Sequence, residues 1–224
     1  EFVADLEKAR TLSLAFEEKW KGKLADAAAK TGAGGLGEAL SEYDALEDLL
    51  GKIGSFAGLT YFSDTSNPAN GKFYGDIQTK LTDLSSHLLF FALELNRIDD
   101  AVINAAMDRD PATGHFRPWL VDLRMDKPFQ LDDKLEQLFL EKSMTSAAAF
   151  NRLFDETMSE LRFEVDGEKQ PLEITLNMLV EPEPETRAKA AVALSKTFGE
   201  NLRVFTLITN TLAKDKEISD RWRG

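Results

Sequence analysis

The sequence contains no cysteine and only two histidines among its 224 residues. The absence of cysteine excludes disulfide bonds, thiolate metal ligands and cysteine nucleophiles. It is typical of a reducing compartment, so we expect a cytoplasmic protein. The two histidines, His87 and His115, lack the i, i+4 partner that a helical zinc site uses. This favours a packing or capping role for each of them.

Basic side chains are also scarce. There are 27 lysines and arginines against 39 aspartates and glutamates, which gives a formal net charge of −12. No block of basic residues stands out, so we expect no nucleic-acid partner and no anionic membrane surface. No apolar run approaches the roughly 18 residues of a membrane span, and no signal segment opens the chain. A hydrophobic content of 43% is enough for a core, so we expect a folded globular protein.

The strongest hydrophobic periodicity lies between Lys72 and Met107 and predicts one long central helix. Its apolar residues alternate in steps of four and three, which is typical of a helix packed against other helices. The members of this seam are Ile77, Leu81, Leu84, Leu88, Phe91, Leu95, Ile98 and Val102. Because residues 88–95 are apolar on more than one face, we expect neighbours on at least two sides of the helix.

Helical patterns dominate the rest of the chain as well. The longest of them run over residues 1–29, 36–61 and about 185–214. The only strand signal is a turn at Asp166-Gly167 between Arg162–Val165 and Leu172–Ile174, which predicts a short β-hairpin. We therefore expect an all-α fold, a bundle of long antiparallel helices with one short β-hairpin at about 162–174.

Two domains are expected from the change in sequence texture after residue 110. Residues 1–110 would form an amino-terminal helical bundle, and residues 115–224 a second region. One continuous domain over 1–224 is the alternative.

Two glycine-containing stretches match known ligand-binding patterns only in part. Gly32–Gly37 matches G-x-G-x-x-G, but an alanine-rich helical segment precedes it where a nucleotide fingerprint needs a buried strand. Asp108–Gly114 begins like a calcium loop, but its glycine comes one position late and Trp119 stands where a bidentate glutamate is required. Both stretches are therefore interpreted as loops.

A mixture of basic and aromatic residues follows, with Arg117, Arg124 and Lys127 around Trp119. Seven residues separate Arg117 from Arg124, so the two arginines share one face of a helix, while Trp119 and Leu123 point elsewhere. This spacing favours Trp119 in the core and the arginines in contact with acids or with another domain, over direct contact with a substrate. Ordinary surface salt bridges are the alternative.

Four segments in this half resemble the amino-terminal half of the oligoendopeptidase F family, which are zinc metallopeptidases similar to thimet oligopeptidase. These segments are His115–Arg124, Lys127–Leu131, Asn151–Glu156 and Arg187–Ala190. The sequence departs from many relatives at Phe129 and Phe150, where histidine and tryptophan are expected.

The resemblance implies a zinc endopeptidase that hydrolyses short peptides, in which the present chain, as the amino-terminal half, forms one wall of the peptide cleft. In that family the zinc is held by an H-E-x-x-H helix and a later glutamate, none of which is present here. The resemblance therefore gives this chain no catalytic and no metal-binding residue, and implies that it is inactive alone. Its partner would be its own carboxy-terminal catalytic domain, and Arg117, Arg124 and Lys127 are the candidates for contacts along the cleft or with that domain.

Two hypotheses follow for the function. The first is the amino-terminal, non-catalytic domain of a zinc oligoendopeptidase. It agrees with a sequence that opens at Glu1 without a methionine and ends just after Trp222, from which we expect a fragment. The second is a free-standing helical scaffold or adaptor, on whose apolar seams a partner helix docks. The reading frame beyond Gly224 distinguishes them.

Overall fold

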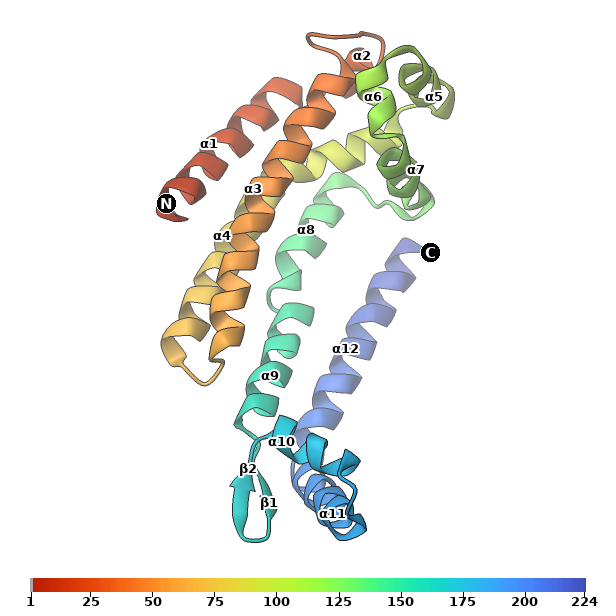
Figure 1. The fold of residues 1–224 in the computed structure, drawn as a ribbon. Coiled ribbons are helices and arrows are strands. Elements are labelled where there is room, and N and C mark those ends of the chain that lie inside the picture. Colours follow the sequence, from red (N-terminus) through yellow and green to blue (C-terminus); the bar gives the residue numbers. More distant parts are fainter. Residues whose placement is uncertain (1) are drawn as a thin grey trace. The chain divides into compact units, whose positions relative to one another are not determined.

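The computed structural model describes residues 2–224, which are almost entirely helical (Figure 1). The elements, in chain order, are α1 (Phe2–Trp20), α2 (Leu24–Ala27), α3 (Leu36–Ser63), α4 (Pro68–Arg97), α5 (Asp100–Arg109), α6 (Pro111–His115), α7 (Arg117–Met125), η1 (Lys127–Phe129), α8 (Asp133–Ser143), α9 (Ala147–Glu160), β1 (Phe163–Val165), β2 (Glu168–Gln170), α10 (Leu172–Asn177), η2 (Met178–Val180), α11 (Pro184–Glu200) and α12 (Leu202–Arg223). The predicted all-α fold with one short hairpin is confirmed. None of the helices in residues 2–224 combines the length and the apolar character that crossing a membrane requires.

The chain divides into two compact units. Unit 1 contains the residues up to Tyr61 together with Lys72–Lys142 and Trp222–Gly224, and unit 2 contains Phe62–Gly71 and Ser143–Arg221. The boundary after Lys142 differs from the division at 110–115 that the sequence texture indicates. Helices α5, α6 and α7 remain in unit 1 because side chains on α7 bind the end of α4, as described below.

In unit 1 the long helices α1, α3 and α4 lie side by side (Figure 1). Phe91 of α4 is fully buried between the other two. Its ring centroid lies 5.2 Å from that of Phe16 on α1 and 4.5 Å from that of Tyr43 on α3. The central helix therefore has neighbours on two sides, as the apolar seam predicts.

The expectation of one helix over 72–107 is wrong at both ends. The helix α4 begins earlier, at Pro68, and ends at Arg97, before the seam ends. The side chain of Asp99 accepts a hydrogen bond of 2.8 Å from the backbone N–H of Ala101, and this cap starts α5 in a new direction. As a result Ile103 is buried, whereas Val102, a predicted member of the seam, is exposed.

Two further predicted helices are interrupted for local reasons. The first stops at Trp20 instead of continuing to residue 29. Gly22 has a positive φ of 76°, and its N–H donates a hydrogen bond of 2.7 Å to Glu94 on α4. The helix expected over 185–214 is divided into α11 and α12 at Asn201, whose side-chain amide donates to the Thr197 carbonyl at 2.9 Å.

The last glycine of the glycine-rich stretch, Gly37, lies in the first turn of α3 and allows close helix packing. Gly37 lies against the first turn of α6, where an added Cβ would stand 2.6 Å from the Ala112 Cβ and 2.7 Å from Asp110 Oδ2. The Asp110 carboxylate in turn accepts from the N–H groups of Ala112 and Thr113, each at 3.3 Å, and so caps α6. Both stretches that resemble ligand loops are thus parts of one contact between helices.

Unit 2 contains the hairpin, whose register places Phe163 opposite Gln170. Asp166 and Gly167 both have positive φ, so a two-residue turn sets this register. The predicted second strand at residues 172–174 is wrong, because these residues begin α10. Pro171 has no N–H to continue the ladder and precedes the first turn of that helix.

Candidate functional site

The predicted basic residues lie on α7 and η1, next to α5. Arg117 and Arg124 project towards α5, where Arg117 pairs with Asp108 and Arg124 pairs with Asp100. Both arginines belong to α7 and both aspartates to α5, so the two ion pairs join the same two helices. The arginines therefore contact acids, as their spacing indicates.

Arg124 has a further role at the carboxyl end of α4. Its Nη1 donates to the Leu95 carbonyl at 2.5 Å and its Nη2 to the Ile98 carbonyl at 2.6 Å. The last carbonyls of a helix have no partner within the helix and carry partial negative charge, which a guanidinium satisfies well. The side chain of Arg124 is only 11% exposed. We conclude that it fixes the turn between α4 and α5.

Lys127 joins Arg124 at the same acid, with its Nζ 3.1 Å from Asp100 Oδ1. The hydrogen bond from Arg124, followed by that from Lys127, lowers the pKa of the Asp100 carboxyl below its ordinary value. Arg117 stands apart from this cluster, 2.5 Å from Asp108 in a pair that is exposed on both sides. The structure brings together two of the three predicted residues, and their role in a cleft or a domain contact stays a prediction.

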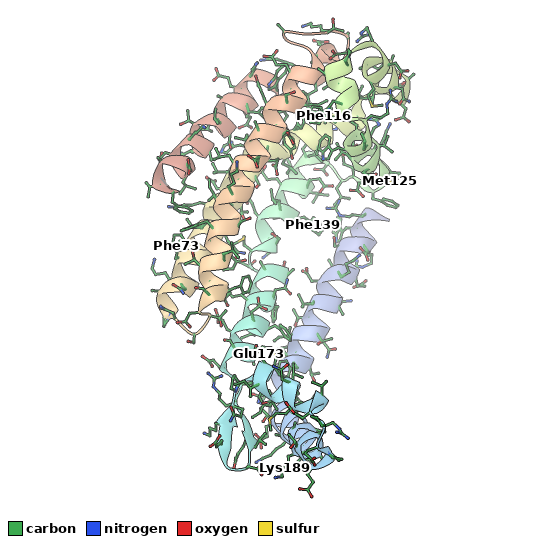
Figure 2. The ribbon with its side chains drawn as sticks, in the orientation of Figure 1. Phe73, Phe116, Met125, Phe139, Glu173 and Lys189 are labelled. Carbon is green, nitrogen blue, oxygen red and sulfur yellow. The ribbon has the colours of Figure 1, made fainter. Side chains whose placement is uncertain are left out.

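Trp119 was expected in the core, but it is 36% exposed. It lies at the edge of the aromatic cluster of unit 1, with its ring centroid 5.7 Å from that of Tyr43 and 6.4 Å from that of Phe91. Trp119 and Tyr43 border a pocket of about 270 Å³ together with Phe116, which is labelled at the α6–α7 junction in Figure 2. The pocket, which we call the Trp119 pocket, is lined by Leu40, Tyr43, Asp44, Glu47, Phe116 and Trp119.

The Trp119 pocket combines aromatic walls with acidic groups. Burial raises the pKa of the Tyr43 hydroxyl far above its ordinary value, and the neighbouring Glu47 carboxylate raises it further. Partial desolvation also raises the pKa of Glu47, although the hydrogen bond from Tyr43 opposes this shift. Neither Asp44 nor Glu47 forms an ion pair with another of residues 2–224. Aromatic faces beside carboxylates are suited to an apolar or a basic side chain.

The sequence gives no direct signal for this pocket. Tyr43 fits the apolar face of α3, and Glu47 fits the solvated face, where it indeed lies exposed. The four-residue spacing of Tyr43 and Glu47 places them on neighbouring turns. Nothing in the local pattern, however, pairs them with Trp119, which is contributed by a distant helix.

The two histidines have packing partners. His87 Nδ1 lies 2.6 Å from a carboxylate oxygen of Glu17 on α1, and the ring of His115 stands edge-on to Phe116 at 5.0 Å. Within residues 2–224 no three histidine, aspartate or glutamate side chains gather in a way that could hold a metal ion. The residues that the structure describes therefore do not fit a zinc site.

Residues 94–163 match the family model described as oligopeptidase F. The matched segment runs from the end of α4 to the start of β1 and includes Arg117, Arg124 and Lys127. A comparison with curated proteins gives no match.

Among solved structures, the chain is similar to oligoendopeptidase-F from Enterococcus faecium, with a TM-score of 0.82 and 18% identity over 100% of this chain and 44% of that one. It is also similar to a candidate peptidase from Chlamydophila abortus, with a TM-score of 0.50 and 14% identity over 86% of this chain and 33% of that one. At these identities the likeness shows the fold. The resemblance to the amino-terminal half of the oligoendopeptidase F family is confirmed, and the chain spans less than half the length of either structure.

Proposed function

We propose that this chain is the amino-terminal, non-catalytic part of a zinc-dependent oligoendopeptidase that hydrolyses short peptides. The observation that carries the proposal is the fold match, which extends over the whole of this chain but over only 44% of oligoendopeptidase-F. The family match over residues 94–163 supports it from sequence. In this proposal the zinc ligands belong to the other part of the enzyme, and the protein works in the cytoplasm.

A catalytic domain as the partner is supported by an apolar pocket in unit 2. This pocket has a volume of about 360 Å³ and lies between α9 and the residues around the α11–α12 junction. Its lining includes Phe154 and Leu202, which are 42% and 62% exposed. Clustered exposed apolar side chains are uncommon on monomeric proteins and mark surfaces that a partner covers.

Contact with the peptide is best supported at the Trp119 pocket. Its aromatic rings and the carboxylates of Asp44 and Glu47 would receive an apolar or basic side chain of a short peptide. In the full-length enzyme, Trp119→Ala should raise the KM for a peptide with a basic side chain several-fold and change kcat little, since it removes binding surface rather than chemistry. An unchanged KM would remove this pocket from substrate binding.

The proposal is tested by comparing the protein encoded by the complete gene with residues 1–224 alone. We expect the full-length protein to cleave an internally quenched short peptide, to lose this activity with a chelator and to regain it with zinc. Residues 1–224 alone should neither cleave the peptide nor retain stoichiometric zinc after dialysis. A stop codon directly after Gly224 would instead support the free-standing scaffold or adaptor.

Arg117 offers a separate test of the basic face of α7. Its pair with Asp108 is exposed, so Arg117→Ala should leave the chain folded. If this face contacts the cleft or the catalytic domain, the variant full-length enzyme should turn over short peptides more slowly. Wild-type turnover would assign this face a purely structural role.

A further inference from the structure

Unit 1 contains a second pocket, of about 340 Å³, at the carboxyl-terminal half of α4. We call it the Asn96 pocket. Its apolar wall includes Leu93, Leu123 and Phe129, and its polar wall includes Asn96 and Gln130. It is distinct from the Trp119 pocket, with which it shares no lining residue.

Two side-chain carbonyl oxygens of residues that line this pocket have no hydrogen-bond partner among residues 2–224. They are Asn96 Oδ1 and Gln130 Oε1, both of which are buried. Asn96 as a whole is only 5% exposed. Buried polar atoms are rarely left without a partner, because the loss of hydration is then not compensated. Two such oxygens on residues that line one pocket are acceptors that a bound donor would satisfy.

The orientation of the Gln130 amide is determined by its surroundings. Its Nε2 donates a hydrogen bond of 3.2 Å to the backbone carbonyl of Leu93. A carbonyl oxygen can only accept, so exchanging the amide nitrogen and oxygen would break this bond. The atom of Gln130 without a partner is therefore an acceptor, and an N–H or O–H group would satisfy it.

The charges around the pocket favour a cation. Glu136 and Arg223 form a two-point ion pair, with N–O distances of 2.7 and 2.8 Å, and neutralise each other. Arg223 is held further by the ring of Phe139, labelled on α8 in Figure 2, whose centroid lies 5.6 Å from its Cζ. The remaining charged residue of the lining is Asp126. The pocket thus has one carboxylate in excess and no uncommitted cation to attract an anion.

A metal ion fits these groups less well than an organic cation. Calcium and magnesium need several oxygen ligands, usually with more than one carboxylate, and Glu136 is already committed to Arg223. An ammonium group supplies three N–H donors and one positive charge. The apolar wall suits a short hydrocarbon stem attached to it.

We propose that the Asn96 pocket binds a primary ammonium group on a short apolar stem. The ammonium donates hydrogen bonds to Asn96 Oδ1 and Gln130 Oε1, and Asp126 balances its charge. A free amine and the amino terminus of a short peptide share this chemistry. The inference is independent of the proposed peptidase function, since binding requires only residues within this chain.

The test is a calorimetric titration of the 224-residue chain with n-butylammonium and with n-butyltrimethylammonium at equal ionic strength. The two cations carry the same charge and stem, but the second has no N–H donor. We expect saturable one-to-one binding of the first and at least about tenfold weaker binding of the second. Equal affinities, or no binding of n-butylammonium, would overturn the proposal, the latter leaving water as the donor in the pocket.

Variants of the chain locate the binding. Asn96→Leu and Gln130→Leu remove one acceptor each at similar volume and should each weaken n-butylammonium binding about tenfold. Gln137→Leu is the matched control, because this exposed glutamine of α8 bonds only to Glu141, and it should bind as the wild type does. Circular dichroism verifies that each variant is folded. Unchanged affinity in both pocket variants would place the binding elsewhere and refute the site.

Two further ligands identify the source and the charge. Tighter binding of leucinamide than of n-butylammonium would identify a peptide amino terminus as the ligand, and the reverse order would identify a free amine. Both orders support an ammonium site. Butyramide, which has N–H donors without a charge, should bind at least about tenfold more weakly than n-butylammonium. Equal binding of butyramide would overturn the assignment of a cation.

Discussion

Unit 1 has a large buried core built around a connected cluster of aromatic rings, whereas the buried core of unit 2 is small. In unit 1 the rings of Phe16, Tyr43 and Phe91 contact one another across three helices. The hydrophobic cluster of unit 2 is built from the buried side chains of Leu161, Phe163, Val165, Ala193 and Leu194. Phe154 and Leu202 of the same unit are 42% and 62% exposed.

The difference shows that similar helical periodicity leads to different degrees of burial. The helices of unit 1 are covered on several sides by other helices of the same unit, while α9 and α12 keep part of their apolar surface open within unit 2. Buried apolar area is the main source of stability. We therefore expect unit 1 to determine most of the stability of this chain, and unit 2 to open locally at lower free energy.

The largest expected effect is that of Phe91→Ala in unit 1. Removing a fully buried aromatic side chain leaves a cavity and should lower the free energy of unfolding by about 3–5 kcal/mol. Phe154→Ala in unit 2 removes the same atoms from an exposed position and should cost less than about 1 kcal/mol. Urea unfolding followed by circular dichroism measures both. Equal losses would contradict the contrast between the two units.

A smaller effect is expected from the arginines that cap helices. Arg124→Met leaves the Leu95 and Ile98 carbonyls without their charged donor and should cost about 2–3 kcal/mol. In unit 2, Arg187 donates to the carbonyls of Glu181 and Pro182, but on the surface. Arg187→Met should therefore cost at most about 1 kcal/mol. Urea unfolding measures both losses. A larger loss of unfolding free energy from Arg187→Met than from Arg124→Met would contradict the expectation that unit 1 determines most of the stability.

Glu136 in unit 1 and Asp155 in unit 2 should contribute to the pH dependence of stability with opposite signs. The hydrogen bond and charge of Arg223 lower the pKa of Glu136 in unit 1 below its ordinary value of 4.5. Its stabilising contribution is then complete above that value and is lost as the pH falls through the lower folded pKa. Glu136→Gln should destabilise the chain at neutral pH and reduce the loss of stability in acid.

Asp155 in unit 2 should behave in the opposite way. Burial alone raises its pKa above the ordinary value of 3.8, so the folded state favours the protonated form. Its contribution to stability is then complete below that value and is lost as the pH rises through the folded pKa. Asp155→Asn should slightly stabilise the chain at neutral pH. Thermal melts of both variants between pH 3 and 7 test the signs, and a shift in the same direction for both would contradict them.

The smallest effect is expected at the exposed apolar residues of unit 2. Leu202→Ser should change the free energy of unfolding of this chain by no more than about 0.5 kcal/mol, because most of the side chain is already in water. In the proposed full-length enzyme, the same variant should lower the stability more strongly if the catalytic domain covers this surface. Equal behaviour in both proteins would show that this residue stays exposed.

Much of the fold could be predicted because helical periodicity is a local property. The seam of α4 and the turn at Asp166-Gly167 are both evident in the sequence. The breaks at Asp99 and Gly22 were missed because a cap or one positive φ ends a helix even where the apolar pattern continues. The predicted second strand failed because Pro171 cannot continue the ladder.

The candidate sites depended far more on the tertiary structure. The spacing of Arg117 and Arg124 correctly predicted contacts with acids, since seven residues bring two side chains to one helix face. The spacing did not show that Arg124 donates hydrogen bonds to the carbonyls at the carboxyl end of α4. Trp119 was expected in the core because the spacing places it and Leu123 on another face than the two arginines, yet the packing of α7 against α3 leaves it at the edge of a pocket.

The sequence by itself determined the all-helical class, the central helix and the resemblance to the oligoendopeptidase F family, because periodicity and short patterns are read within one or two turns of the chain. Only the tertiary structure decided that Tyr43 meets Trp119 and that Asn96 and Gln130 leave two oxygens free in one pocket. These contacts join helices that are distant in sequence. Whether a polar atom finds a partner depends on the packing of those helices, which no local pattern encodes.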